Sequence, residues 1–251
     1  MARRVVITGI GLVSPLGNDL ESAWKRLRDG ESGITRLTDD VIADSGYFQS
    51  RIAGRCVDFV SPPTDLPLLP VKEGKKADRF SQFTCYAGVR AVEQSGIDFQ
   101  EVESQGLPCA SIIGCGVGGL GEIEAQSQKL DKEVIRLKGK PEGGFIGRIS
   151  PFTIPRIIPN SAASNLAIMY KLHGPSYSIA TACASSNNAM IETYKGILLG
   201  EYDVALTGGT EAAICRLGMA GFGAMSALSK HNEYPEKASR PFDKDRDGFV
   251  M

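Results

Sequence analysis

One cysteine has surroundings that suit nucleophilic chemistry. Cys183 lies between a predicted strand at residues 177–182 and a helical pattern at residues 184–199. The start of a helix stabilises a thiolate, because the helix dipole and its free backbone N–H groups favour negative charge there. The neighbours of Cys183 are alanine, serine and threonine, which let a substrate approach. This position predicts a catalytic thiol, although free cysteines more often serve as small buried hydrophobes.

A glycine cluster follows another predicted strand, at residues 110–114. Its spacing, Gly114-x-Gly116-x-x-Gly119, matches the dinucleotide-binding fingerprint. The cluster follows the second strand rather than the first, however, and Glu122 and Glu124 would lie where a pyrophosphate needs positive potential. We therefore interpret it as a strand-to-helix turn that packs against other backbone.

An aspartate motif lies near residue 245. Residues 243–248 read Asp-x-Asp-x-Asp-Gly, as at the opening of an EF-hand calcium loop. A proline precedes the motif, where an EF-hand would have a helix. We interpret the motif as a charged turn in which Arg240 and Arg246 pair with the carboxylates.

The other candidates for metal binding or acid–base chemistry are few. The six cysteines form no C-x-x-C pair, and the chain has only two histidines, so zinc-site spacing is absent and no metal or cofactor is implied. Either His173 or His231 could form a hydrolase dyad with Cys183, but nothing in the sequence brings them together. Sparse, unpaired cysteines are typical of a reducing compartment, here the cytoplasm.

The elements that must position Cys183 alternate between strands and helices. Strands are expected at residues 5–13, 110–114, 177–182 and 204–209, with another beginning near residue 247. Helices are expected at residues 20–28, 78–95, 122–137, 155–170 and 184–199, and a small-residue helix or tight coil at 218–228. A long irregular excursion is expected at residues 32–70 and a glycine-rich turn at 138–147. Short buried strands alternating with helices predict a largely parallel sheet with helices on both faces.

The composition excludes two classes of partner. Lys and Arg number 28 against 29 Asp and Glu, and this balance argues against a nucleic-acid binder. The longest uncharged stretch near the end, residues 217–229, is shorter than the ~20 apolar residues of a membrane span. Glycine is abundant, at 29 of 251 residues, but neither periodic nor clustered in low-complexity tracts. Its abundance therefore predicts tight turns and close backbone packing.

Five blocks of sequence resemble the elongating β-ketoacyl-acyl-carrier-protein synthases, most closely their type II form. The blocks are VVITGIG at residues 5–11, IIGCGVGG at 112–119, SIATAC at 178–183, GFGA at 221–224 and SRPFDKDRDGF at 239–249. The resemblance implies a thiolase-like α/β fold, in which a mixed, mostly parallel sheet is flanked by helices. Residues 1–251 then correspond to the N-terminal synthase domain, the first half of an αβαβα sandwich, and end as its fifth, antiparallel strand begins.

The resemblance also implies a reaction. In this family a cysteine accepts an acyl chain from acyl-carrier protein. Two histidines then promote decarboxylation of malonyl-carrier protein, and the resulting carbanion attacks the thioester in a Claisen condensation that elongates fatty acids. Cys183 matches the nucleophile of these acyltransferases, and its backbone N–H matches one oxyanion donor.

Further site residues follow from the same resemblance. Val117 and Phe222 match the acyl pocket, and Ile154 matches a residue that reaches the pocket of a neighbouring subunit, which implies a homodimer. The family's basic patch for the acidic carrier protein is matched by Lys72, Lys75 and Lys76. Considered apart from the resemblance, these lysines are more typical of a solvent-exposed loop. Three lysines within five residues also suit the electrostatic steering of an anionic partner.

Residues 1–251 resemble only the first half of the family, whose two histidines and lysine belong to the second half. We therefore expect this chain alone not to condense. One alternative is a non-catalytic fragment that self-associates or binds a partner through apolar side chains of the helix after Cys183. Those side chains are Met190, Tyr194, Ile197 and Leu198. A cysteine hydrolase using His231 is another. The segment at residues 125–145 is longer than expected for the family.

Overall fold

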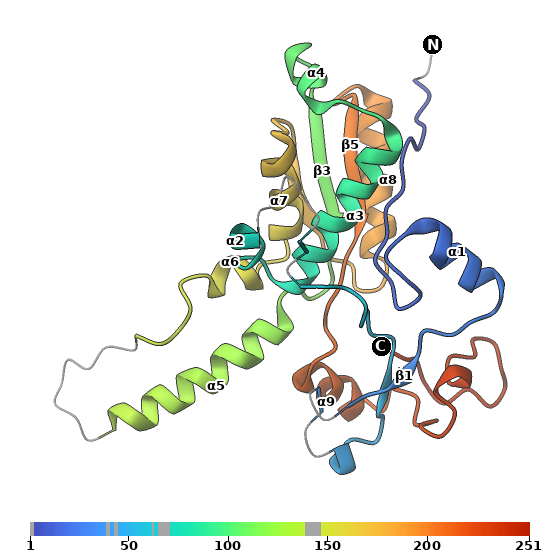
Figure 1. Cartoon of the computed structure of the whole chain (residues 1–251), viewed down its shortest axis with the longest axis vertical. Coiled ribbons are helices and arrows are strands. Elements are labelled where there is room, and N and C mark those ends of the chain that lie inside the picture. Colours follow the sequence, from blue (N-terminus) through green and yellow to red (C-terminus); the bar gives the residue numbers. More distant parts are fainter. Residues whose placement is uncertain (1–2, 39–40, 43–44, 62, 65–70, 139–146) are drawn as a thin grey trace.

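The computed structural model describes residues 3–38, 41–42, 45–61, 63–64, 71–138 and 147–251 (Figure 1). Its helices are α1 (Leu20–Arg28), α2 (Val71–Gly74), α3 (Arg79–Ser95), α4 (Phe99–Ser104), α5 (Leu120–Leu137), α6 (Thr153–Ile157), α7 (Ser161–Tyr170), α8 (Ser185–Leu199) and α9 (Arg216–Ala224). Short 3-10 turns are η1 (Ser45–Tyr47) and η2 (Pro235–Lys237). The strands are β1 (Thr35–Arg36), β2 (Ile52–Ala53), β3 (Cys109–Gly114), β4 (Ser176–Ile179) and β5 (Val204–Gly209). Most of the predicted turn at 138–147 lies outside the described residues.

A parallel sheet forms the centre of the molecule. Its strand order is β4-β3-β5, and β3 is buried along its whole length. Ala110 and Ile112 share a buried cluster with Ala189 of α8 on one face. On the other face Ile113 packs with the small residues of α7, and the Ser111 hydroxyl donates to the Ala163 carbonyl at 2.9 Å. The predicted parallel sheet with helices on both faces is therefore confirmed (Figure 1).

Local signals determine where several helices begin and end. The side chains of Asp19 and Asp78 accept backbone N–H bonds at the starts of α1 and α3, which satisfies donors that a helix leaves free there. Gly96 and Gly200 adopt left-handed φ values of +66° and +80° and end α3 and α8. The helices predicted at residues 20–28, 78–95 and 184–199 are confirmed, whereas α4 was not predicted, although Asp98 caps it in the same way.

The strand predicted at residues 5–13 is wrong. This segment joins no sheet and instead follows helix α3, where the Ile10 N–H donates to the side-chain oxygen of Gln94 at 2.6 Å. A Cβ on Gly9 or Gly11 would lie about 2 Å from the α3 carbonyl oxygens of Ala91 and Ala87. The glycines therefore allow backbone to touch a helix, a packing that the β-branched residues around them do not reveal.

Two further predictions need correction. Residues 32–70 are not wholly irregular, because β1 and β2 pair antiparallel within them. The strand predicted from residue 247 reduces to a single parallel bridge between Leu228 and Phe249, away from the central sheet. In the described part of the chain, the central sheet thus has three strands, not the four or five that the sequence predicts.

Helix α5 projects from the body of the molecule (Figure 1). It contacts α6 and α9 and leaves side chains such as Val134 and Ile135 exposed. In α8, Met190 and Tyr194 are exposed as expected, but Ile197 and Leu198 are half-buried, since Ile197 packs on the cluster beneath the sheet. Within the described residues, none of the helices has the length and apolar character to span a bilayer.

Candidate active site

The chain segments that follow the three parallel strands meet at the carboxyl ends of those strands. Gly114, Ile179 and Gly209 end β3, β4 and β5, and their neighbours in the chain line a cavity of about 970 Å³. Ligands of open parallel sheets bind at these ends, because strands that run in one direction present their following loops together. The cavity also has the size of a small-molecule pocket.

Cys183 lies in this cavity, in a turn between β4 and α8. Ala182 before it has a left-handed φ of +52°, an uncommon conformation for a residue with a side chain and one that clusters at active sites. The Ser185 hydroxyl holds the turn, because it donates to the Ala182 carbonyl at 2.6 Å and accepts from the Thr181 N–H at 2.9 Å. The thiol therefore stands just before the N-cap Ala184, as the sequence predicts.

Two glycines let α8 approach the strands. A Cβ on Gly114 would lie 2.3 Å from the carbonyl oxygen of Ser185, and one on Gly209 would lie 2.5 Å from the Cβ of Ser186. Real Cβ atoms do not approach other atoms so closely. The start of α8, and with it Cys183, can therefore lie against β3 and β5 only if these positions are glycine.

The six cysteines, all in described parts of the chain, differ in access. Cys183 alone is exposed. Burial raises the pKa of Cys85 and Cys115 to about 12, which keeps these thiols protonated. Cys56 lines the same cavity as Cys183, but burial raises its pKa too, against the opposing charge of Arg79. Access therefore favours Cys183 as the nucleophile.

The remaining cavity wall is largely apolar. Val117 and Phe222, assigned to an acyl pocket by resemblance, both line it, and Phe222 meets Phe249 edge to face with ring centroids 5.3 Å apart. Ile154 lies elsewhere, on α6, with 66% of its surface exposed. A hydrocarbon chain attached to Cys183 would thus find apolar surroundings beside Val117 and Phe222.

Glu211, which the sequence reasoning missed, also lines the cavity. One carboxylate oxygen accepts the N–H groups of Gly116 and Val117 at 2.9 and 3.0 Å, which fixes the turn that bears Val117. Desolvation by the cavity walls raises the pKa of Glu211, although these backbone donors oppose the shift. The sequence does contain a signal for this residue, because Glu211 is an acidic residue two positions after the end of the strand predicted at 204–209.

The glycine fingerprint is a packed turn, as interpreted from the sequence. The N–H groups that would cradle a phosphate bind Glu211 instead. A Cβ on Gly118 or Gly119 would lie 2.4 or 2.2 Å from the carbonyl oxygens of Ile157 and Arg156. The turn is therefore closed by a carboxylate and by α6.

The aspartate motif is a charged turn. Asp247 accepts from the Ser229 hydroxyl and the Lys230 N–H, both at 2.7 Å, and lies 3.7 Å from the Arg240 guanidinium. The predicted pairing of Arg246 is wrong, because its side chain donates to the Asp243 backbone carbonyl rather than to a carboxylate. Across the described ranges, no three His, Cys, Asp or Glu side chains gather as a metal site.

Neither histidine reaches Cys183. His173 contacts Glu103 at 3.3 Å beside a smaller cavity of about 260 Å³, where β3 begins, at the opposite end of the strand from Cys183. His231 follows α9, with its ring 5.8 Å from that of Tyr234, and does not line the Cys183 cavity. The hydrolase dyad is therefore wrong, because the fold holds both imidazoles away from the thiol.

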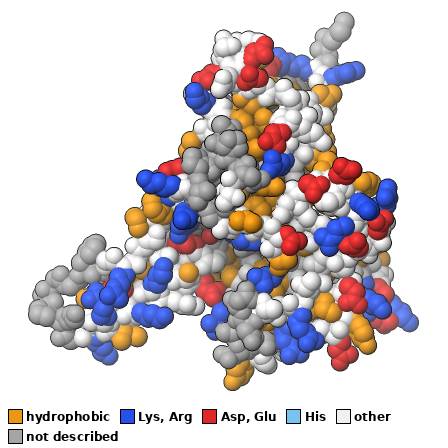
Figure 2. All heavy atoms as spheres, in the orientation of Figure 1, with side chains coloured by type: hydrophobic (Ala, Val, Ile, Leu, Met, Phe, Trp, Pro, Cys, Tyr) orange, Lys and Arg blue, Asp and Glu red, His pale blue; other side chains and the backbone are white. Residues whose placement is uncertain are grey.

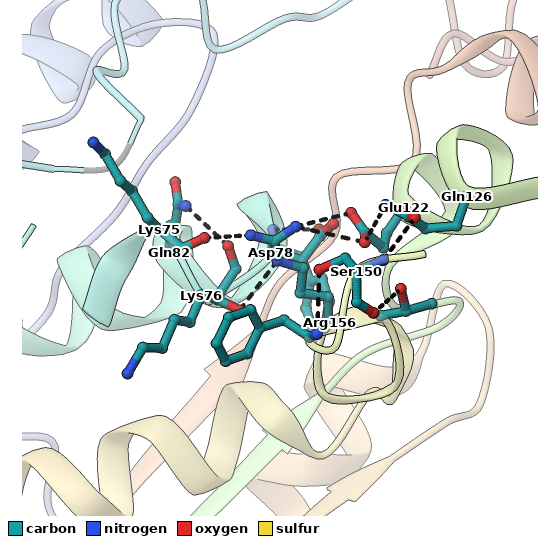
Figure 3. A network of polar contacts seen from close by, with 12 residues as sticks. Lys75, Lys76, Asp78, Gln82, Glu122, Gln126, Ser150 and Arg156 are labelled. Carbon is teal, nitrogen blue, oxygen red and sulfur yellow. Dashed lines mark hydrogen bonds and ion pairs between the residues drawn. The ribbon is translucent and has the colours of Figure 1, made fainter. Parts of the chain in front are cut away.

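The lysine cluster lies on and after α2. Lys72 and Lys75 are exposed, whereas Lys76 is half-buried and pairs with Glu73 at 2.7 Å. Figure 2 shows Lys and Arg side chains along the projecting helix α5 and others spread over the rest of the same face. Arg156 of α6 holds the backbone of this cluster (Figure 3).

Sequence comparisons place the chain among known proteins. The sequence model described as "Beta-ketoacyl synthase, N-terminal domain" matches residues 2–251. The chain is 41% identical over 249 residues to 3-oxoacyl-[acyl-carrier-protein] synthase 2 of Vibrio cholerae, which covers 99% of this chain and 55% of that protein. It is 39% identical over 250 residues to 3-oxoacyl-[acyl-carrier-protein] synthase I, chloroplastic, of Arabidopsis thaliana, with 99% and 49% covered.

A solved structure shows the same fold. A β-ketoacyl synthase from Burkholderia phymatum STM815 superposes with a TM-score of 0.78 at 26% identity, over 100% of this chain and 56% of that one. This likeness confirms the thiolase-like α/β architecture. The chain spans about half the length of the curated relatives it matches. It belongs to the β-ketoacyl synthase family, whose N-terminal domain it matches from residue 2 to residue 251.

Proposed function

We propose that this chain, as an N-terminal synthase domain, supplies the nucleophile of a 3-oxoacyl-[acyl-carrier-protein] synthase in fatty-acid elongation. The observation that carries the proposal is the exposed Cys183 in an apolar cavity at the carboxyl edge of the sheet. The names of the relatives supply the acyl-carrier protein as the partner. The free thiols fit the cytoplasm as the compartment.

The first proposed step is acyl transfer. The Cys183 sulfur attacks the thioester carbonyl of acyl-carrier protein, and the carrier thiol leaves with the proton that Cys183 gives up. The backbone N–H of Cys183 donates to the oxyanion of the tetrahedral intermediate. The acyl chain then lies along Val117 and Phe222. Glu211 does not react and holds the Val117 turn in place.

The second proposed step is condensation. Malonyl-carrier protein loses CO₂, its carbanion attacks the acyl carbonyl on Cys183, and the Cys183 thiol leaves and regains a proton. This step needs donors that stabilise the enolate. Neither His173 nor His231 lines the cavity, so the isolated chain is expected to stop at the acyl-enzyme.

Mass spectrometry tests whether this chain is acylated but does not condense. The 251-residue chain incubated with a medium-chain acyl-carrier protein is expected to gain one acyl group, mapped to Cys183 by peptide analysis. Adding malonyl-carrier protein is expected to give no 3-oxoacyl product. No acylation of Cys183 would contradict the proposed first step, and condensation by this chain alone would contradict the expectation that it stops at the acyl-enzyme.

We also propose a homodimer. β4 is an edge strand of the central sheet, and edge strands present unpaired backbone groups to a second chain. Apolar side chains lie exposed on β4, α7 and α8, which include Tyr177, Ile168, Met190 and Tyr194. An edge strand flanked by such a patch is typical of an interaction site.

Light scattering is expected to give twice the 26.8 kDa of one chain. Tyr177→Asp is expected to shift the protein toward monomer, because it places a charge on the edge strand. Tyr47→Asp is the control, since this tyrosine is also exposed but lies on η1. A monodisperse monomer at high concentration would refute the dimer and the self-associating alternative together.

A further inference from the structure

Arg156 lies at the centre of a polar network that joins three segments of the chain (Figure 3). From α6, its guanidinium approaches the Glu122 carboxylate of α5 at 3.3 and 3.5 Å. Its other nitrogens donate to the backbone carbonyls of Lys76, at 3.2 Å, and Lys75. All three nitrogens of the planar fork are thus engaged, a geometry that the single ammonium of a lysine cannot reproduce.

The network is largely shielded from solvent. The side chains of Arg156 and Glu122 are 23% and 10% exposed. Glu122 also accepts from the amide of the buried Gln126 at 2.9 Å, and Gln126 in turn accepts the Ser150 N–H. Removing the guanidinium would leave a shielded carboxylate without its ion partner, which costs more than the loss of an exposed ion pair.

The charge of Arg156 also acts on a second carboxylate, that of Asp78. Asp78 caps α3, two residues after Lys76. Burial and the nearby negative charge of Glu122 raise the pKa of Asp78, whereas the charge of Arg156 opposes the shift. Arg156 therefore pairs with Glu122 and also opposes the rise in the pKa of Asp78, where the lysine segment enters α3.

The backbone of Arg156 is itself anchored. The Gly119 N–H donates to the Ile157 carbonyl at 3.1 Å, and the glycine turn leaves no room for a Cβ against the Arg156 carbonyl. The side chain therefore extends from a fixed base to the lysine backbone. Because it binds the backbone carbonyls of Lys75 and Lys76, it does not engage their ammonium groups: Lys75 is exposed, whereas the ammonium of Lys76 pairs with Glu73 at 2.7 Å.

We propose that Arg156 is a positioning residue for partner docking: it holds residues 72–76 in the orientation in which their lysines receive the acidic acyl-carrier protein. This inference rests on the proposed function, which names that partner, and on the family resemblance, which matches Lys72, Lys75 and Lys76 to the basic patch for it. Arg156 itself need not touch the partner, since its nitrogens are occupied within the chain.

Arg156→Ala tests the proposal with two readouts. Hydrogen exchange is expected to quicken at the Lys76 and Ala77 amides, which bond to the Glu73 and Gly74 carbonyls at 2.9 and 3.1 Å. The concentration of acyl-carrier protein for half-maximal acylation of Cys183 is expected to rise about tenfold, because the docking charges lose their orientation. Acylation by a small acyl thioester without a carrier protein is expected to stay at the wild-type rate, which a general folding defect would not allow.

Three further variants separate the possible outcomes. Arg156→Lys keeps the positive charge but not the planar fork. It is expected to quicken the same amide exchange and to raise the same half-maximal carrier-protein concentration, and it replaces Arg156→Ala if that variant does not fold. Arg90→Ala, which removes an exposed pair with Glu93, is expected to change neither readout. A third variant replaces Lys72, Lys75 and Lys76 with alanine. If its half-maximal concentration of acyl-carrier protein equals that of the wild type, the proposed docking site is refuted. Hydrogen exchange in the Arg156 variants then still shows whether Arg156 holds the segment in place. Unchanged exchange and unchanged carrier dependence in both Arg156 variants would overturn the proposal.

Discussion

Cys183→Ser lowers acyl transfer to the chain by roughly 10³-fold or more, because a serine hydroxyl without an adjacent base is a far weaker nucleophile than a thiol. The turn holds the side chain through Ala182 and Ser185, neither of which the substitution changes. Stability should therefore stay near that of the wild type. The measurement is the rate of mass gain after mixing with a long-chain acyl thioester.

Cys56→Ser is the matched control for this experiment. Cys56 lines the same cavity, so it meets the same thioester, but burial raises its pKa and it is less accessible than Cys183. The control is expected to be acylated at the wild-type rate. If the acyl group remained in Cys183→Ser and mapped to Cys56, the nucleophile would be misassigned.

Gly114→Ala lowers the free energy of unfolding by about 3 kcal/mol, the upper end of the usual cost of overpacking a core. The new methyl group would lie 2.3 Å from the carbonyl of Ser185, and backbone at the start of a helix cannot rotate away as a side chain could. The start of α8 must move, and Cys183 moves with it. Acylation should therefore fall as well, and urea unfolding and mass gain measure the two effects.

Gly221→Ala provides the comparison. Gly221 lies within α9, and nothing stands within 4 Å of a Cβ placed there. Alanine is the better helix former, so stability should be unchanged or rise by up to about 1 kcal/mol. If both glycine variants were equally stable, the close approach of α8 to β3 would not be what requires glycine at residue 114.

Helix positions were predictable where the signals are local. Asp19 and Asp78 cap helices through bonds to backbone two or three residues ahead, and Gly96 and Gly200 end helices through their own left-handed conformation. Such contacts form within one turn of chain, so the sequence pattern contains both partners. The strand at residues 5–13 failed for the opposite reason: a β-branched run specifies neither its partner nor its pairing, and this one lies against α3.

The candidate nucleophile could be identified from local signals in the same way. A cysteine between a strand and a helix has its electrostatic environment set by the elements that adjoin it in the chain, and the five matching blocks then supplied the family. The fold class was therefore predictable from the sequence, and Cys183 could be proposed as the nucleophile from the sequence alone.

Long-range contacts decided the rest. Glu211 meets Gly116 and Val117 across more than 90 residues of sequence, and Arg156 meets Lys75 and Lys76 across about 80. Which carboxylate closes a glycine turn, and which guanidinium holds a loop, depends on how parallel strands and their helices bring distant segments together. Only the tertiary structure could separate His173 and His231 from the thiol and place Val117, Phe222 and Glu211 around one cavity with Cys183.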